Sequence, residues 1–502
     1  MIPVPPDTSD ASSEGVTSQQ ATLWVPADFA RRHALYPVSV QEGVLRIVSA
    51  CRLGEEVVDD LRLITGLEID ASTDSVEAVA EGIAERYQVT VERMLGDLGS
   101  ATAVAEGKNL HDIEVMANEP TVVNLVNVVI SAALRERASD IHLIPFESSI
   151  QLRYRIDGLL QEKQPPPKQL HPAIVSRIKI MADLNIAERF LPQDGHIQIQ
   201  HRGARVDIRV GTLPTIHGES VVMRLLEKDN RLQTPEELGL DPQRAALLRH
   251  LTQKPHGLFL ATGPTGSGKT TTLYAILQQS FTVTKKIITI EDPVEYELPG
   301  VAQIPVKPGR GFTFATGLRA ILRQDPNVVM VGEIRDAETA EIAIRAALTG
   351  HQVLSTLHTN DAAGAVTRLI DMGVEPFLVA SSLDGVLAQR LVRRLCPACR
   401  RPAPAPSAIR DKFTIPDRDY WTGTGCDDCR GTGYRGRIGI FELLEVTQAL
   451  RELILQRRSS ADLKASVRGS MITLFDDGLR KAIDGLTSLE EVVRVCSGDD
   501  KE

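Results

Sequence analysis

Aromatic residues are scarce in this 502-residue chain, at 4% of the sequence, so its cores must be built from Leu, Ile, Val and Ala. Hydrophobic residues make up 42% and charged residues 24%, the balance of an ordinary globular protein. No apolar run can span a bilayer of roughly 30 Å, since the longest, Val122 to Leu134, is interrupted by polar residues. The first 20 residues contain no Lys or Arg and no apolar stretch, so we expect no secretory signal and a cytoplasmic protein.

An excess of basic residues is also missing, because the formal net charge is −10. An acidic chain repels polyphosphate, which disfavours nucleic acid as a partner and leaves no general attraction to anionic lipid. Any membrane association is therefore expected to be peripheral and to run through a protein partner. A local cluster of arginines keeps a nucleic-acid-binding zinc ribbon as an alternative, although no aromatic residues are interleaved with it. Its members are Arg393, Arg394, Arg400, Arg401, Arg435 and Arg437.

Cysteine is sparse, with six residues, but four of them form two Cys-x-x-Cys pairs. Thiolates at this spacing suit a tetrahedral, structural Zn²⁺ site, and in a reducing compartment metal is favoured over a disulfide. A redox dithiol pair is the alternative, but no thioredoxin-like surround is visible. The predicted zinc ligands are Cys396, Cys399, Cys426 and Cys429.

Composition and periodicity divide the chain into four regions. Residues 1–20, rich in Ser, Thr, Pro and Asp, predict a disordered tail, and mixed patterns predict a small N-terminal α+β domain over 21–110 that includes a linker at Gly96 to Asn109. Over 111–232, alternating strands such as Ile150 to Ile156 predict a sheet with helices on one side. From 233 to 502, apolar strands alternate with helices, which is typical of a largely parallel α/β sheet.

The strand Leu258 to Ala261 runs into a segment that matches the Walker A pattern G-x-x-x-x-G-K-[ST] in full. Its glycines allow backbone N–H groups to surround a phosphate at the start of the following helix, Thr271 to Gln279. Lys269 is expected to reach the outer phosphates of ATP and the Thr270 hydroxyl to bind Mg²⁺. The predicted nucleotide-binding residues are Gly263, Pro264, Thr265, Gly266, Ser267, Gly268, Lys269, Thr270 and Thr271.

Two further apolar strands end in carboxylates. Val328 to Val331 precedes Glu333, which at the carboxyl end of a buried parallel strand would face the γ-phosphate and orient or deprotonate water. The alternative is a surface glutamate that caps the next helix. Ile287 to Ile290 precedes Glu291 and Asp292, which suit a magnesium shell or a water-positioning role, or else form an acidic surface turn.

Two histidines flank the short strand Val353 to Ser355. An uncharged His351 or His358 at a strand end could sense a γ-phosphate through a hydrogen bond, or both could be structural. The residues alone leave these alternatives open.

Four segments carry a family resemblance: GPTGSGKTTTLY, ITIEDPVEYE, RQDPNVVMVGEIRDAETA and TGHQVLSTLHTND. They resemble the Walker A, Asp box, Walker B and His box of the secretion ATPases, motors of type II secretion systems and type IV pili. The segment Arg137 to His142 and the stretch Leu191 to Glu227 also match. The resemblance covers residues 120–495, whereas the residues before Leu110 match only loosely.

The resemblance implies a PAS-like middle domain joined to a RecA-like motor domain, with six copies in a ring. It also implies that arginines of the middle domain complete the active site, and these correspond to Arg209 and Arg224. A charge between Met223 and Leu225 is costly unless a partner neutralises it, and phosphate would serve. A structural salt bridge to Asp207 or Glu219 is the alternative. Asn327 and His196 depart from residues common in the family, beside the core positions.

In the family that the chain resembles, secretion and pilus-extension ATPases carry a tetracysteine insertion, whereas pilus-retraction motors generally lack it. The insertion corresponds to residues 394–436 here. The segments LRERASDIHLIPFE and GLRAILRQDPN are closer to the type II secretion form. The resemblance thus implies a Mg²⁺-dependent hexameric ATPase that drives pseudopilus assembly, with type IV pilus extension as the alternative. It implies that the N-terminal domain docks on a cytoplasmic-domain protein of an inner-membrane platform. A regulatory scaffold that binds ATP without hydrolysing it is a third hypothesis.

Overall fold

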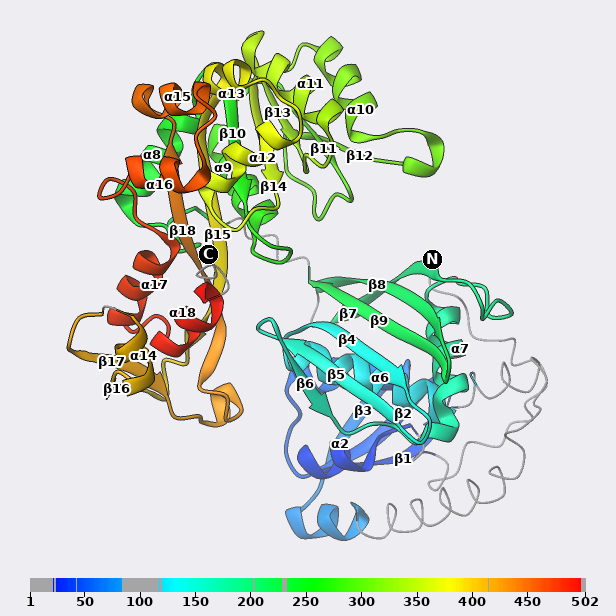
Figure 1. The fold of residues 1–502 in the computed structure, drawn as a ribbon. Helices are drawn as coiled ribbons and strands as arrows, with labels where there is room; N and C mark the ends of the chain where they lie inside the picture. The colour runs from blue at the N-terminus through cyan, green and yellow to red at the C-terminus, as the bar shows by residue number, and fades with distance from the viewer. Residues whose placement is uncertain are drawn as a thin grey trace. The chain divides into compact units, whose positions relative to one another are not determined.

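The computed structural model describes residues 21, 24–41, 43–83, 117, 120–201, 204–227, 233–413 and 415–497 (Figure 1). The predicted tail and the predicted linker at Gly96 to Asn109 lie outside these residues. The chain divides into two compact units, Met1–Asp229 and Asn230–Glu502. Among the described residues, no helix combines the length and apolarity needed to cross a membrane.

The first unit begins with a small three-stranded sheet in the order β1-β2-β3. Strands β1 and β2 are antiparallel and β2 and β3 are parallel. Helix α3 packs its apolar residues Leu61 and Ile64 into a core with Leu35 and Leu45. The described elements are α2 (Ala27–Arg32), β1 (Leu35–Gln41), β2 (Val44–Ser49), α3 (Glu55–Thr65) and β3 (Glu68–Thr73).

A six-stranded antiparallel sheet in the order β6-β5-β4-β9-β8-β7 forms the rest of the first unit. Alternate residues of its strands share one apolar core with helices α6 and α7, as the period-2 patterns predicted. The opposite face of each strand carries the polar residues. These elements are α6 (Pro120–Arg135), β4 (Ala138–Pro145), β5 (Ile150–Ile156), β6 (Leu159–Lys163), α7 (His171–Met181), β7 (Gln193–His201), β8 (Ala204–Thr215) and β9 (Gly218–Glu227).

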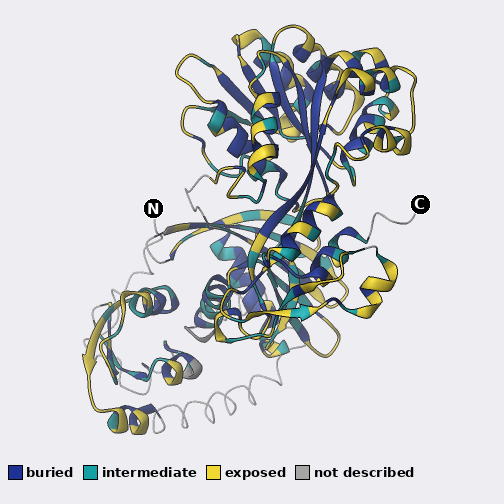
Figure 2. Cartoon of the chain, turned by 90° about the vertical axis from the view of Figure 1, so that its left-hand side faces the viewer, coloured by how far each residue is buried: buried dark blue, intermediate teal, exposed yellow. Residues whose placement is uncertain are grey.

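The second unit is built on a seven-stranded sheet in the order β12-β11-β13-β14-β10-β15-β18. All neighbouring pairs are parallel except β15 and β18. Its central strands are buried on both faces, which explains their continuous apolar runs (Figure 2). The strands are β10 (Gly257–Thr262), β11 (Ile287–Glu291), β12 (Ala302–Pro305), β13 (Val328–Val331), β14 (Gln352–Leu357), β15 (Leu383–Leu395) and β18 (Tyr434–Glu445).

Helices cover both faces of this sheet, and successive strand residues point into two separate cores. Phe259 packs with helices α8 and α9, whereas Leu258 and Leu260 pack with α10, α11 and α12. Because the strands are parallel, the carboxyl ends of β10, β11, β13 and β14 meet at one edge, where ligands bind in sheets of this type. The helices are α8 (Pro242–Thr252), α9 (Lys269–Ser280), α10 (Phe314–Ile321), α11 (Ala337–Leu348), α12 (Ala362–Asp371) and α13 (Pro376–Ser382).

A small cysteine-bearing module lies between β15 and β18. It contains a two-stranded antiparallel sheet, β16 (Arg400–Pro404) and β17 (Asp419–Gly423), and helix α14 (Ser407–Lys412). After β18 the chain ends in four short helices, α15 (Gln448–Leu455), α16 (Ser460–Ser466), α17 (Leu474–Ile483) and α18 (Leu489–Cys496).

Candidate functional site

The phosphate loop connects β10 to α9 and depends on glycine at two positions. Gly263 has φ of 145° and Gly268 has φ of 87°, conformations that other residues rarely adopt. A Cβ on Gly263 would lie 2.4 Å from the backbone oxygen of Gln389, so no side chain fits there. The loop therefore runs close to β15, and α9 begins at Lys269 with its first N–H groups toward the loop.

Lys269 is a buried cation at the centre of this loop. Its side chain is 8% exposed, and its Nζ donates hydrogen bonds to the carbonyl oxygens of Gly263 (2.7 Å) and Pro264 (3.1 Å). Burial lowers its pKa to about 8, against the opposing attraction of Glu333. Ser267 is 4% exposed, and its Oγ has no hydrogen-bond partner among the described residues. A buried ammonium and an unsatisfied buried hydroxyl in one glycine loop fit the oxygens of a phosphate.

Thr270 and Thr271 lie in the first turn of α9, where both are half-buried. Pro264, Thr265 and Gly266 form the exposed tip of the loop. The hydroxyl of Thr270 follows Lys269 directly, so it lies at the helix terminus where a magnesium ion on the β- and γ-phosphates would need an oxygen ligand.

Glu333 follows β13 at the same sheet edge, and its side chain is 12% exposed. Arg335 donates from Nη2 to Oε1 at 2.5 Å, and the ring nitrogen Nε2 of His358 lies 3.3 Å from Oε2. The hydrogen bond to Glu333 raises the pKa of Arg335. The helix-capping alternative does not hold, because Asp336 is the N-cap of α11 and accepts from the backbone N–H of Thr339 at 2.8 Å. Glu333 is also close enough to Lys269 in the phosphate loop to oppose the lowering of that lysine's pKa.

The two carboxylates after β11 differ in their surroundings. Glu291 is 2% exposed and accepts hydrogen bonds from the hydroxyl of Tyr274, from Thr289 Oγ1 (2.5 Å) and from Gln303 Nε2 (3.1 Å). Burial, followed by the bond to Glu291, raises the pKa of Tyr274. Asp292 is exposed and close enough to Arg335 to raise the pKa of that arginine. Glu291 therefore belongs to a buried network, whereas Asp292 is accessible to solvent.

The two histidines lie at opposite ends of β14. His358 follows the carboxyl end of the strand and contacts Glu333. His351 precedes the strand, and its Nδ1 lies 3.1 Å from the carbonyl oxygen of Ala346 in α11. Six strand residues separate the two ends, a distance of about 20 Å. Of these two histidines, His358 lies at the end of β14 that pairs with the carboxyl end of β10, where the phosphate loop begins.

Three residues of the site had no assigned role in the sequence analysis. Arg335 lies in the GEIRD segment, two positions after Glu333. This closeness in sequence to Glu333 was the signal that could have identified it. Gln389 of β15 lies against the loop at Gly263, and its Oε1 accepts from Thr272 of α9 at 2.7 Å. Gln303 donates to Glu291 from β12. The last two carry no local motif, because they reach the site only through sheet pairing.

Arg209 and Arg224 are cross-strand neighbours on β8 and β9 of the first unit. Arg224 Nε donates to Asp140 Oδ1 on β4 at 3.0 Å. The salt bridge of Arg224 is therefore made to Asp140, an acid that the sequence analysis did not weigh. Asp207 pairs with Arg205 (3.5 Å) and Glu219 with Lys179 (2.5 Å).

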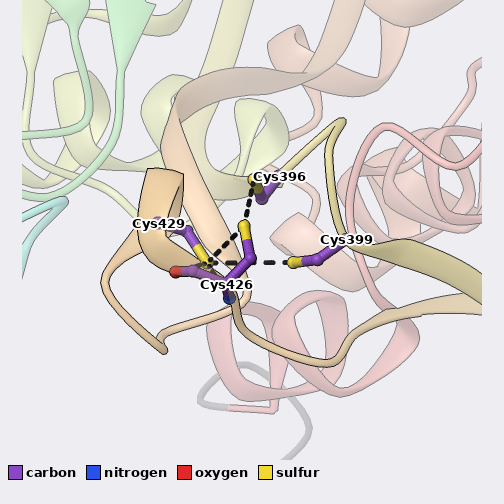
Figure 3. A group of neighbouring side chains, drawn as sticks. All are labelled: Cys396, Cys399, Cys426 and Cys429. Carbon is purple, nitrogen blue, oxygen red and sulfur yellow. Dashed lines mark hydrogen bonds between the residues drawn. The ribbon is translucent and has the colours of Figure 1, made fainter.

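The four predicted zinc ligands converge from two loops (Figure 3). Their Sγ atoms all lie within 4.8 Å of one another, with three pairs at 3.7–3.8 Å. Zn–S bonds of about 2.3 Å in a tetrahedron place sulfurs about 3.8 Å apart, so the group fits a closed Zn²⁺ site. Burial raises the pKa of Cys429, but backbone N–H donors from Cys426 and Gly433 outweigh it and lower that pKa to about 6. A thiolate, the form that binds zinc, is therefore favoured at this position.

Comparison with known proteins agrees with this architecture. The family model "Type II/IV secretion system protein" matches residues 116–494. A relative from Myxococcus xanthus, "Type IV pilus assembly ATPase PilB", is 46% identical over 484 residues, which cover 93% of this chain and 85% of the relative. "Type II secretion system ATPase E" of Vibrio cholerae is 46% identical over 438 residues, 85% of this chain and 86% of the relative.

Solved structures support the same assignment. The "Pilus Retraction Motor PilT", with bound ADP, is 26% identical and superimposes with a TM-score of 0.51 over 73% of this chain and 96% of its own. The ATPase DotB of Legionella pneumophila, 21% identical, shares the fold with a TM-score of 0.55 over 74% of this chain and 95% of its own. The chain belongs to the family of type II/IV secretion system proteins, as one of its ATPases.

Proposed function

We propose that the chain hydrolyses ATP at the edge formed by β10, β13 and β14. Lys269 and Ser267 bind the terminal phosphates, and Glu333 holds the attacking water and accepts its proton. Glu333 attracts the buried Lys269 electrostatically, which supports one shared site. Thr270 and Asp292 would hold Mg²⁺ directly or through water, and the ion supplies neutralisation of phosphate charge. His358, in contact with Glu333, is placed to sense the γ-phosphate.

The active site is completed between subunits of a homo-hexamer. Arg209 and Arg224 from one subunit meet the phosphates bound by its neighbour, where an arginine supplied in trans contributes about 10³–10⁵ in rate. The side chain of Arg224 is 59% exposed, so it is accessible to a group that comes from outside its own sheet. Closure and opening of the ring with each ATP then produce mechanical work.

We assign that work to pseudopilus assembly and protein export in a type II secretion system, with type IV pilus extension as the alternative. Relatives with both names match at 46% identity. The family resemblance associates the cysteine module with these two kinds of motor rather than with retraction motors. The protein acts in the cytoplasm, peripherally at the inner membrane. The N-terminal domain over 21–110 docks on the cytoplasmic-domain protein of the secretion platform. Zinc in the cysteine module is structural.

The test measures ATP turnover of the full-length chain against its oligomeric state. Lys269→Ala and Glu333→Gln should each abolish more than about 99% of kcat, because each removes a group that acts on the phosphate or water. Glu338→Gln is the matched control, since Glu338 pairs with Arg319 on the surface of α11 (2.7 Å) and should leave kcat unchanged. Full turnover in Glu333→Gln would overturn its role. Restored secretion in a secretion-deficient host, without restored pili in a pilus-deficient one, decides between the two machines.

A further inference from the structure

A row of charged residues crosses five strands of the middle-domain sheet on the face opposite α6 and α7. Cross-strand pairing joins His196 to Arg209, Arg209 to Arg224, Arg224 to Asp140 and Asp140 to Arg155. Like charges placed directly opposite each other destabilise a sheet, so Arg209 beside Arg224 needs a compensating anion. Asp140 is the one carboxylate in this row.

Asp140 is buried and engaged through both oxygens. Its side chain is 8% exposed. Oδ1 accepts from Arg224 Nε at 3.0 Å, and Oδ2 lies 3.3 Å from Arg155 Nε and accepts from Ser139 Oγ at 2.8 Å. These charge-assisted contacts hold the Asp140 carboxylate in place. Arg155 would still neutralise its charge if Arg224 moved away.

The hydrogen bond from Arg224 to Asp140 uses only the Nε atom of the guanidinium group. Its Nη1 and Nη2 have no recorded partner among the residues that the structure describes, and the side chain is 59% exposed. The two terminal nitrogens are the pair that binds phosphate oxygens in a fork. An arginine held by Nε with its terminal nitrogens open is oriented for an anion that comes from outside this sheet.

We propose that Asp140 is a positioning residue for ATP hydrolysis, which holds the guanidinium of Arg224 in the orientation that meets the phosphates of a neighbouring subunit. The inference rests on the proposed role of Arg224 between subunits. Arg155 and Ser139 keep the Asp140 carboxylate in place while Arg224 binds phosphate. Preorganisation of this kind raises the rate because the orienting entropy is lost before the reaction rather than during it. This proposal also gives a role to Ser139 and Asp140, which lie in the segment Arg137 to His142 that resembles the secretion ATPases.

The test is steady-state ATP hydrolysis by the full-length oligomer carrying Asp140→Asn. We expect kcat to fall about tenfold while KM for ATP stays within about twofold, because the substitution disorients Arg224 and leaves the phosphate loop intact. Glu136→Gln is the matched control: it removes the contact with Lys163 (2.6 Å) in the same domain but does not touch the arginine row. Thermal unfolding and oligomer size show whether each variant is folded.

A double-mutant cycle separates positioning from a general loss of stability. If Asp140 acts through Arg224, adding Asp140→Asn to Arg224→Ala causes no further loss of kcat, whereas independent effects multiply. Multiplying losses, or an unchanged kcat in Asp140→Asn, overturn the inference. Normal turnover in Arg224→Ala instead overturns the proposed intersubunit role. Should Asp140→Asn not assemble, Asp140→Glu carries the same cycle, since it keeps the charge and shifts its position.

Discussion

At the residue scale, the most informative side chain is Lys269, whose ammonium group is buried in the phosphate loop. Its hydrogen bonds go to carbonyl oxygens of Gly263 and Pro264, and burial holds its pKa at about 8, below the ordinary 10.5. Bound phosphate favours the charged form and would raise that pKa. Proton linkage then makes nucleotide affinity depend on pH.

ATP affinity should be constant below pH 8 and should fall above it. Between the pKa of about 8 in the free chain and the higher pKa in the complex, the loss approaches about tenfold per pH unit, because one proton must be taken up on binding. Titration calorimetry from about pH 7.5 to 9.5 measures this, well above the second pKa of about 6 that is typical of a phosphate group. Lys269→Arg, whose charge does not titrate here, is the control. A flat wild-type profile would show that Lys269 stays charged in the free chain.

Individual site residues differ in how far the sequence predicts them. Lys269 and Glu333 follow strands with unambiguous patterns, so parallel topology alone predicts that the two residues lie at the same edge of the sheet. Asp140 and Arg224 are 84 positions apart, and no local pattern links them. Their contact depends on the register of β4 against β9, which is set by tertiary packing. The sequence analysis weighed Asp207 and Glu219, which lie close in sequence to the arginines, whereas the acid that pairs with Arg224 lies on β4.

At the element scale, β11, β12 and α9 are joined by a polar network around Glu291. Gln303 Nε2 donates to Glu291 (3.1 Å) and to the backbone oxygen of Tyr296 (3.1 Å), and Tyr274 donates its hydroxyl to the same carboxylate. Sequence reasoning predicted the bounds of β13 without error, because a short apolar run between polar residues is unambiguous. It gave Glu291 a magnesium-shell or water-positioning role, because a strand end does not reveal which way its last side chain points.

Tyr274→Phe should therefore lower stability more than nucleotide affinity. Loss of a hydrogen bond to a buried charged group costs about 1.5–3 kcal/mol, so the unfolding transition of the second unit should shift down by several degrees. Tyr296→Phe is the matched control, since this ring packs edge-on against Tyr274 (4.6 Å between centroids). Differential scanning calorimetry and ATP titration measure both quantities. A large loss of ATP affinity with unchanged stability would return Glu291 to the magnesium shell.

At the scale of the whole second unit, β15 links the phosphate loop to the cysteine module. Gln389 supports the loop near the middle of the strand, and Cys396 follows its end. The last residues of β15 are tied to the C-terminal helical segment. Leu395 N donates to the Leu486 oxygen (3.0 Å), and Arg393 pairs with Glu491 (2.9 Å). Arg393 and Arg494 hold the pKa of Glu491 at about 2 despite its burial, so this contact with α18 persists at neutral pH.

Removal of zinc should unfold the module without abolishing nucleotide binding. Cys426→Ser or a strong chelator should reduce bound zinc from one ion per chain to none, and proteolysis should then cut the module, because four thiolates without metal cannot hold two loops together. Pairing of β15 with β18 and the Glu491 contact keep Gln389 in place, so ATP affinity should change by less than about threefold. Zinc analysis, limited proteolysis and ATP titration on one sample compare the three effects. If ATP affinity fell as strongly as the resistance of the module to proteolysis, the metal would also be needed to keep the phosphate loop folded. Loss of structure in the module would then extend along β15 to Gln389.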